Sequence, residues 1–241
     1  MQGAAFAAAG LDARYVKLPL PAALFDETVR ALPGSGYCGV NVTIPHKQAA
    51  LRLADDATPT ALAVGAANTL TFDDGRVEAD NTDAGGFLAA LGTSVEGSTA
   101  VVLGAGGAAR AVVWALKDAG AAHVLVWNRT EARARALAAD FGVSVIAAPQ
   151  PCDALVNATS VGLHAEDDVA ELGLDRFEPP PIVADLVYAA GGDTPVARWG
   201  RRGGARVVDG REMLVRQGAL SFERWTGHAA PLDAMRRALR G

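Results

Sequence analysis

The first part of the chain alternates β-rich runs with segments whose apolar residues recur at helical spacing. Strands are predicted over residues 15–20, 40–44, 68–72 and 76–79, and helices over 22–32, 46–53 and 82–91. The helix at 22–32 is expected to carry apolar residues on one face, at Leu24, Phe25, Val29 and Leu32. The string Asp73-Asp74-Gly75 separates two of the strands, and an Asp-Gly pair at this place is typical of a hairpin turn.

A second series of alternating elements begins at Thr99, after a small, polar stretch at 92–98 that indicates a domain boundary. Strands are predicted over 100–103, 124–127, 143–146, 154–156, 182–185 and 206–207. Helices are predicted from the glycine-rich segment at 104–110 to about 119, and over 131–141, 211–226 and 231–239. This alternation favours an α/β fold over all-α and all-β folds.

Composition limits the kinds of partner. The 241 residues include 22 Lys plus Arg and 27 Asp plus Glu, a net charge of -5, and half of them are apolar. The chain can therefore bury a core, whereas a protein that tracks nucleic-acid phosphates would carry a basic excess. No apolar run is long enough to span a bilayer, and the first ten residues lack the basic segment of a signal peptide. We expect neither a nucleic-acid nor a membrane partner.

The two cysteines, Cys38 and Cys152, lie far apart in the sequence and neither belongs to a CxxC pair. This usage predicts neither a disulfide framework nor a zinc site. We expect two free thiols in a reducing cytoplasm and no bound metal.

A glycine-rich segment between a predicted strand and a predicted helix has the spacing GxGxxA. Its glycines and alanines are Gly104, Ala105, Gly106, Gly107, Ala108 and Ala109. The first glycine permits a tight turn, Gly106 lets the backbone approach a pyrophosphate, and Ala109 lets the helix pack on the strand. The phosphates would then lie at the helix N-terminus, where N–H groups and the helix dipole favour an anion. We interpret the segment as a dinucleotide site, the alternative being a purely structural turn.

The end of the following strand distinguishes the two nicotinamide cofactors. Sites for NAD place Asp or Glu here, to bind the ribose 2′-hydroxyl. This chain has Asn128, Arg129 and Thr130, with Arg133 one helical turn later. A guanidinium binds a 2′-phosphate through paired hydrogen bonds, which a carboxylate would repel. The pattern favours NADP, the alternative being that both arginines are solvated surface charges.

Lys47 follows the strand at 40–44, and Asp83 lies in the first turn of the helix at 82–91. Each has an ordinary explanation, Lys47 as a solvated surface residue and Asp83 as an acid that favours the helix dipole. Beside a nicotinamide cofactor, a Lys next to a carboxylate can supply the proton that carbonyl reduction needs. The sequence does not show whether the two residues meet.

Strings along nearly the whole chain resemble the shikimate dehydrogenase family, in that family's order. They are Asn41-Val-Thr-Ile-Pro-His-Lys47, Gly65-Ala-Ala-Asn68-Thr69, Asn81-Thr-Asp83, Gly104-Ala-Gly-Gly-Ala108, Asn128-Arg-Thr130, Asn157-Ala-Thr-Ser160 with Gly162, Asp185-Leu-Val-Tyr188, and Asp209-Gly-Arg-Glu-Met213-Leu with Gln217. The resemblance implies an NADP-dependent reduction of 3-dehydroshikimate to shikimate in aromatic amino-acid biosynthesis.

The resemblance also assigns roles to residues. Lys47 and Asp83 would be the catalytic pair. Substrate would be held by Thr43, Asn68, Asp83, Tyr188 and Gln217. The NADP site would be lined by Gly104, Ala105, Gly106, Gly107, Ala108, Asn128, Arg129, Thr130, Arg133, Leu186, Gly210 and Met213. The implied fold has two α/β domains with a cleft between them, a substrate domain at 1–92 plus 209–241 and a Rossmann-type NADP domain at 93–208.

The family pattern begins with a strand and a Ser-x-Ser loop that binds the substrate carboxylate, whereas this sequence begins at Met1-Gln-Gly-Ala-Ala-Phe6, which resembles the helix after that loop. We expect a start placed too late, the alternatives being another carboxylate anchor or lost activity. A chain without that strand is expected to turn over shikimate poorly and to self-associate through exposed sheet edges. Two other functions remain open, a quinate or aminoshikimate dehydrogenase and a non-catalytic NADP-binding sensor. The expected assembly is a monomer or a homodimer.

Overall fold

The computed structural model describes residues 1–164, 166–188 and 192–240. The chain packs as two compact units, unit 1 with Met1–Gly86 and Leu214–Gly241, and unit 2 with Phe87–Met213. Both divisions fall inside helices, in α5 (Thr82–Leu91) and in α9 (Gly210–Thr226). The boundary predicted at 92/93 follows the end of α5, and the one at 208/209 precedes the start of α9. Packing instead divides the chain within both helices.

Unit 1 contains a four-stranded sheet in the order β1-β3-β4-β2. Its strands are β1 (Gly39–Asn41), β2 (Asp56–Ala57), β3 (Thr69–Asp73) and β4 (Arg76–Asp80). The β3–β4 pair is the predicted hairpin, and Asp74 and Gly75 take φ angles of 46° and 77° at its turn. Two successive positive φ angles give a turn whose twist matches that of the strands, and Asp-Gly tolerates them. The hairpin prediction is confirmed.

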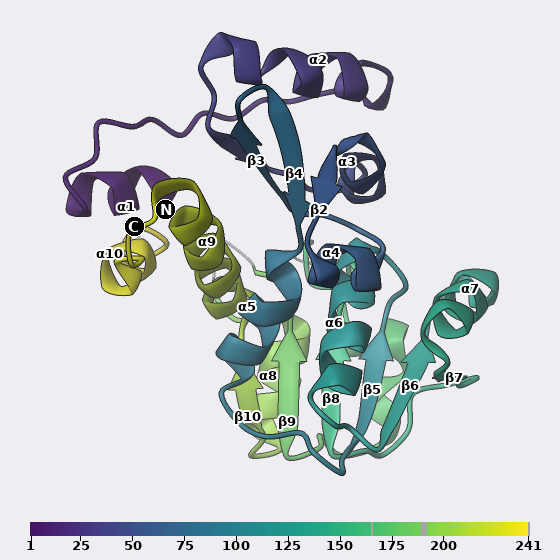
Figure 1. Cartoon of the computed structure of the whole chain (residues 1–241). Coiled ribbons are helices and arrows are strands. Elements are labelled where there is room, and N and C mark those ends of the chain that lie inside the picture. Colours follow the sequence, from purple (N-terminus) through teal and green to yellow (C-terminus); the bar gives the residue numbers. More distant parts are fainter. Residues whose placement is uncertain (165, 189–191, 241) are drawn as a thin grey trace. The chain divides into compact units, whose positions relative to one another are not determined.

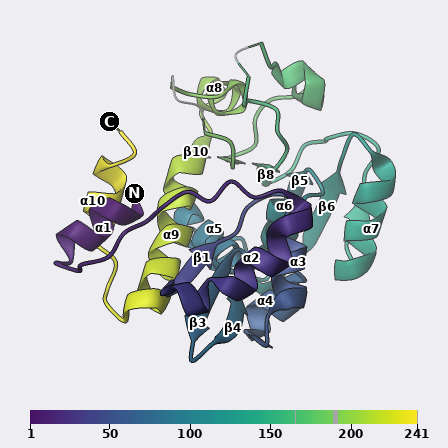
Figure 2. The same ribbon diagram turned by 90° about the horizontal axis from the view of Figure 1, so that it is seen from above.

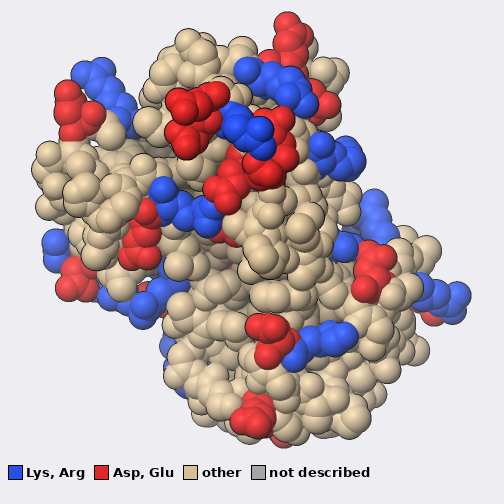
Figure 3. All heavy atoms as spheres, viewed as in Figure 1, with Lys and Arg blue, Asp and Glu red and all other residues tan. Residues whose placement is uncertain are grey.

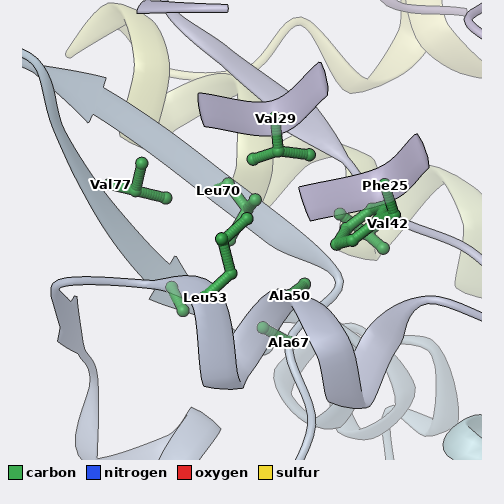
Figure 4. Packing of buried hydrophobic residues seen from close by; sticks show 9 residues of the cluster. Phe25, Val29, Val42, Ala50, Leu53, Ala67, Leu70 and Val77 are labelled. Atoms are coloured by element: carbon green, nitrogen blue, oxygen red, sulfur yellow. The ribbon is translucent and has the colours of Figure 1, made fainter. Parts of the chain in front are cut away.

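Two helices cover this sheet, α2 (Phe25–Ala31), which follows the 3₁₀ turn η1 (Ala22–Leu24), and α3 (Lys47–Leu53). Figure 4 shows side chains from both helices meeting those of the strands, with Val29 and Leu53 on either side of Leu70. The predicted apolar face is correct at Phe25, Val29 and Leu32 but wrong at Leu24, which is exposed. Leu24 belongs to the 3₁₀ turn, whose three residues per turn rotate it away from the face that α2 buries.

A separate core in unit 1 joins the two ends of the chain. The helices α1 (Gln2–Ala8) and α10 (Leu232–Arg237) lie beside the C-terminal part of α9 (Figures 1 and 2). Phe6 and Phe222 are buried there with ring centroids 5.6 Å apart, and Met235 is fully buried beside them. This packing fixes α9, which carries Gln217 and Ser221.

Unit 2 is built on a six-stranded, wholly parallel sheet in the order β10-β9-β8-β5-β6-β7. Its strands are β5 (Thr99–Leu103), β6 (His123–Trp127), β7 (Ser144–Val145), β8 (Ala154–Asn157), β9 (Ile182–Asp185) and β10 (Arg206–Val208). The helices α6 (Gly107–Asp118) and α8 (Pro195–Arg202) lie on opposite faces (Figure 2), and α7 (Glu131–Phe141) follows β6. Because helices cover both faces, the central strands β5 and β8 are buried and apolar apart from Thr99 at the start of β5 and Asn157 at the end of β8. The predicted α/β fold with a Rossmann-type parallel sheet is confirmed.

Some predicted elements are wrong or shortened. Residues 15–20 form no strand, because Tyr15, Val16 and Leu18 are exposed and this part of the chain pairs with no neighbouring strand. β1 stops at Asn41 and β7 spans only two residues, each being an edge strand with one partner.

Several short elements were not predicted. They are β2, α4 (Pro59–Val64), α8 and the 3₁₀ turns η2 (Pro33–Ser35), η3 (Val169–Leu172) and η4 (Leu174–Arg176). The helices α4 and α8 begin in the same way, since Thr58 and Thr194 cap them and a proline follows each cap. The Thr-Pro pair was the available sequence signal, because both helices are too short to show a clear apolar period.

Charged side chains of both signs are interspersed over the part of the surface that carries β3 and β4 (Figure 3). Arg76 pairs there with Asp56, and Arg224 pairs with Glu78 and Asp80. The Arg76–Asp56 pair is exposed on both sides, and such pairs typically contribute less than about 1 kcal/mol. No helix in the described part of the chain is long and apolar enough to cross a membrane.

Candidate active site

Lys47 and Asp83, which are 36 residues apart in the sequence, meet in unit 1. Lys47 is the first residue of α3 and Asp83 lies in the first turn of α5. The Lys47 Nζ atom is 2.6 Å from Asp83 Oδ2, and the side chains are only 12% and 7% exposed. Removing either partner of such a partly desolvated pair leaves a buried charge uncompensated, which is strongly destabilising. The geometry therefore excludes the solvated-surface explanation of Lys47.

Asn68 holds the other oxygen of this carboxylate. Its side-chain amide donates to Asp83 Oδ1 at 3.0 Å, to Thr82 Oγ1 at 2.9 Å and to Gln217 Oε1 at 3.1 Å, so two hydrogens are shared among three acceptors. Its carbonyl oxygen accepts the Thr82 backbone N–H at 2.7 Å. Four of the predicted site residues, Lys47, Asn68, Asp83 and Gln217, therefore form one hydrogen-bonded group.

Gln217 can reach Asn68 because α5 and α9 approach closely at a glycine. A Cβ atom on Gly86 would lie 2.6 Å from the Gln217 backbone nitrogen and 2.7 Å from its Cα atom. Any side chain at position 86 would push α9 away. The Gln217 amide also donates to the Leu214 carbonyl at 2.9 Å, which fixes its orientation within the helix.

A buried set of polar side chains supports this group, and sequence reasoning gave these residues no role. Thr69, Thr82 and Ser221 place their hydroxyls within 2.8–3.2 Å of one another. The Asn41 amide donates to Ser221 Oγ at 2.8 Å, and the Tyr15 hydroxyl donates to Asn41 Oδ1 at 3.0 Å. Asn41, Thr69 and Thr82 occur within the family-like strings, whereas nothing in the helical pattern around Ser221 distinguished it from a surface residue.

The remaining predicted substrate residues are placed differently. Thr43 lies on the loop after β1 with its side chain exposed, and its hydroxyl has no partner among the described residues. Tyr188 belongs to unit 2 and is 51% exposed. Within that unit it lines a small pocket with Val187, Asp193, Thr194, Asp209 and Arg211.

The glycine loop of unit 2 has the conformation that its sequence predicts. Gly104 takes a φ of 112°, and a Cβ atom there would lie 2.7 Å from the Ala158 carbonyl oxygen. Gly106 caps α6 without a side-chain hydrogen bond, and a Cβ there would meet open space. Ala109 is fully buried. The backbone is therefore open to a ligand at Gly106 while helix and strand pack tightly behind it, which fits a pyrophosphate.

The end of β6 offers cationic and hydroxyl groups to a nucleotide. Arg129, Thr130 and Arg133 are exposed, and neither arginine has an ion-pair partner in the described ranges. The Asn128 amide donates to the Thr130 carbonyl at 2.9 Å, which holds the turn. Unpaired guanidinium groups fit a 2′-phosphate. Together with the glycine loop, these residues fit NADP.

The last three predicted cofactor residues lie in the same unit. A Cβ atom on Gly210 would lie 2.5 Å from the Leu186 carbonyl oxygen, so only glycine permits this contact. Met213 is buried. Within the residues that the structure describes, no cluster of three or more His, Cys, Asp or Glu could hold a metal ion. Cys38 and Cys152 are free, and burial raises the pKa of the Cys152 thiol to about 11.

Family profiles match most of the chain. The profile described as shikimate dehydrogenase substrate binding domain matches residues 1–70. The shikimate / quinate 5-dehydrogenase profile matches residues 88–161, and the shikimate 5′-dehydrogenase C-terminal domain profile matches residues 210–240.

Individual proteins agree with these profiles. The chain is 42% identical to a shikimate dehydrogenase (NADP(+)) of Methanothermobacter thermautotrophicus, over 100% of this chain and 90% of that protein. A crystal structure of shikimate dehydrogenase from Aquifex aeolicus superposes with a TM-score of 0.93 at 34% identity, covering 100% of this chain and 91% of the other. The shikimate 5-dehydrogenase of Thermus thermophilus, solved in complex with NADP(H) and shikimate, gives a TM-score of 0.89 at 39% identity over 99% of this chain and 92% of the other. By sequence, by fold and by the motifs at its site, this chain belongs to the shikimate dehydrogenase family.

Proposed function

We propose that this chain is an NADP-dependent oxidoreductase that reversibly reduces 3-dehydroshikimate to shikimate, a step of aromatic amino-acid biosynthesis. The observation that carries the proposal is the buried Lys47–Asp83 pair, held by Asn68, in a chain of this family. The relative in complex with NADP(H) and shikimate supports both the cofactor and the substrate.

Reduction of the ketone adds two electrons as hydride to carbon and one proton to oxygen. NADPH, when bound, supplies the hydride. The Lys47 ammonium has three hydrogens and its recorded bond is to Asp83, which leaves donors for the carbonyl oxygen of the substrate. Lys47 Nζ stabilises the developing alkoxide and donates its proton to that oxygen. In the oxidation of shikimate, Lys47 Nζ accepts the hydroxyl proton.

Asp83 keeps Lys47 in place, because Asp83 Oδ2 lies 2.6 Å from Lys47 Nζ. Asn68 in turn fixes the Asp83 carboxylate through Oδ1. Substrate hydroxyls are assigned to Thr43, Asn68, Asp83, Tyr188 and Gln217. Unit 1 is assigned to the substrate and unit 2 to NADP, corresponding to 1–92 plus 209–241 and to 93–208 in the sequence analysis.

NADP is assigned to the loop from Gly104 to Ala108, to Asn128, Arg129, Thr130 and Arg133, and to Leu186, Gly210 and Met213. The conformation of Gly104 and the unpaired arginines support this assignment. We further propose a cytoplasmic location, which the two free cysteines support. The proposed assembly is a monomer or a homodimer, with no nucleic-acid or membrane partner.

The test is steady-state kinetics of the purified chain, oxidising shikimate, quinate and aminoshikimate with NADP and, separately, with NAD. The expected result is the highest kcat/KM for shikimate with NADP. A higher kcat/KM for quinate or aminoshikimate would identify that compound as the substrate and leave the proposed reaction class unchanged. Tight NADP binding without turnover of any substrate would favour a nucleotide-binding sensor and contradict the proposed activity.

A further inference from the structure

Asp185 is a fully buried carboxylate that the proposed reaction does not use. It is the last residue of β9 and is 0% exposed. It directly precedes Leu186, Val187 and Tyr188, the segment assigned above to cofactor and substrate. A charged group is seldom buried completely without a partner of opposite charge, so its surroundings need an explanation.

Three hydrogen-bond donors from three different segments converge on this carboxylate. The Asn157 amide donates to Oδ1 at 2.9 Å from the end of β8. The Val187 backbone N–H donates to Oδ1 at 3.0 Å from the segment after β9. The Thr194 hydroxyl donates to Oδ2 from the residue that caps α8. One carboxylate therefore ties two strand ends to the start of a helix.

The donors extend this connection into the loops. Asn157 also donates to the Val161 carbonyl at 3.0 Å, and its Oδ1 accepts the Thr159 hydroxyl at 2.7 Å. Thr194 accepts the Ala197 N–H at 3.1 Å. Thr194 and Val187 also line the pocket that Tyr188 borders. The carboxylate therefore lies directly behind a surface that Tyr188 helps to form.

No cation neutralises Asp185, since no described Lys, Arg or His lies within ion-pair distance of it. The charged and titratable side chains around the adjacent pocket are Asp193, Asp209, Arg211 and Tyr188. Burial raises the pKa of the Asp185 carboxyl from 3.8 to about 6, and the negative charge of Asp209 also raises it, while the three hydrogen bonds lower it.

Unit 1 contains a matched arrangement. Thr58 caps α4 before a proline, accepts the Ala61 N–H at 3.2 Å and donates to Asp80 Oδ1 at 2.6 Å. Asp80, however, also pairs with Arg224 at 3.2 Å. The same cap thus exists in a version with a cation and in the unit that carries none of the residues assigned to NADP, which provides a control for NADPH binding.

We propose that Asp185 is a positioning residue, whose ionised carboxylate holds the segment from Leu186 to Tyr188 in the geometry that binds cofactor and substrate. The proposal rests on the proposed function for the identity of those ligands. An ionised carboxylate accepts all three hydrogen bonds. When the carboxyl is protonated, one oxygen becomes a donor, so the Thr194 hydroxyl has to turn from donor to acceptor and the remaining bonds lose their charge assistance. The clamp therefore loosens when the carboxyl is protonated.

The first experiment compares wild type with Asp185→Asn. The readouts are kcat/KM for shikimate oxidation and the NADPH dissociation constant, each measured from pH 5 to 8.5. Wild type is expected to lose kcat/KM and NADPH affinity as the pH falls through about 6. At pH 8, Asp185→Asn is expected to be about tenfold poorer in kcat/KM, since a charge-assisted hydrogen bond is lost, and it should lack the acidic transition near pH 6. The melting temperature of Asp185→Asn should not fall together with its kcat/KM.

A second pair of variants covers the case in which Asp185→Asn does not fold. Thr194→Val removes one donor to Asp185 and Thr194→Ser keeps it, while Thr58→Val removes the matched cap of α4. Thr194→Val is expected to shift the acidic transition and weaken NADPH binding, Thr194→Ser to restore both, and Thr58→Val to change neither.

An Asp185→Asn protein with the wild-type pH profile and NADPH affinity would overturn the proposal, as would equal losses in Thr58→Val and Thr194→Val. If wild type binds NADPH but oxidises none of the substrates, the proposed function fails while the NADPH titrations still decide the role of Asp185.

Discussion

Asp83 and Asp185 are both buried carboxylates, one in each unit, and their charges are balanced in different ways. Asp83 has a cation, since the Lys47 ammonium lies 2.6 Å away. Asp185 has only dipoles, from one amide, one backbone N–H and one hydroxyl. A cation can deliver a proton to a substrate, whereas convergent dipoles can only fix the positions of the segments that carry them. Under the roles proposed above, the first carboxylate serves chemistry and the second serves geometry.

Removing the cation from the first carboxylate should have the largest effect. In an active form of the protein, Lys47→Ala should lower kcat by about 10²–10⁴-fold, because general acid catalysis is lost. The substrate KM should change less, because Lys47 acts mainly on the alkoxide-like transition state. Initial rates of shikimate oxidation with NADP measure both constants.

The Asp83→Asn variant tests the other partner of the same pair. It should lower kcat similarly, and the double variant should be less than additive if the pair acts as a unit. A Lys47→Ala protein within twofold of wild type would return Lys47 to the role of a surface charge.

Titration of Asp185, the second carboxylate, should make the free energy of unfolding depend on pH. Because the folded protein holds the Asp185 proton more tightly than the unfolded chain, the stability that Asp185 contributes is fully present below the unfolded pKa of 3.8 and is lost as the pH rises through about 6. The loss is roughly 3 kcal/mol, about two pKa units at 1.4 kcal/mol each.

The measurement is urea unfolding of wild type and Asp185→Asn between pH 4 and 8. Relative to the variant, wild type should lose stability across this window and remain less stable above it. Parallel stability curves for the two proteins would show that Asp185 does not titrate there.

Cofactor choice should depend on the unpaired arginines of unit 2. Arg129→Ala should raise the KM for NADPH about tenfold or more and leave the KM for NADH nearly unchanged, because a charge-assisted bond contributes roughly 1.5–3 kcal/mol. Arg135→Ala is a suitable control, since Arg135 already pairs with Glu131 on the same helix. Equal use of both cofactors by wild type would contradict the assignment.

The smallest effect should come from the two Thr-Pro caps. Thr58→Val and Thr194→Val should each lower the free energy of unfolding by about 1 kcal/mol, the typical contribution of an N-cap side chain. The loss should be larger at Thr194, because Asp185 then keeps fewer donors and has no cation, whereas Asp80 keeps Arg224. Thermal or urea unfolding at pH 8 measures the difference, and a larger loss at Thr58 would count against this account of the two carboxylates.

Sequence reasoning located the elements that follow from local pattern. The Asp-Gly turn, the glycine loop and the helix at 131–141 each depend on residues close together in the chain, and the structure has all three. Residues 15–20 show the limit of that reasoning, because β-branched and aromatic residues form a strand only where another strand offers hydrogen bonds. Short helices such as α4 and α8 depend on their caps and packing more than on periodicity.

By itself, the sequence determined the alternating α/β architecture, the conformation of the loop at Gly104 and the family to which the chain belongs. These depend on local backbone preferences and on strings of adjacent residues. Only the tertiary structure decided that Lys47 and Asp83 meet, that Asn68 and Gln217 join them, and that Asp185 collects donors from three segments. The reason is physical, since such contacts depend on how helices and strands pack, including the close approach at Gly86, and no local pattern encodes the distance between residues far apart in the chain.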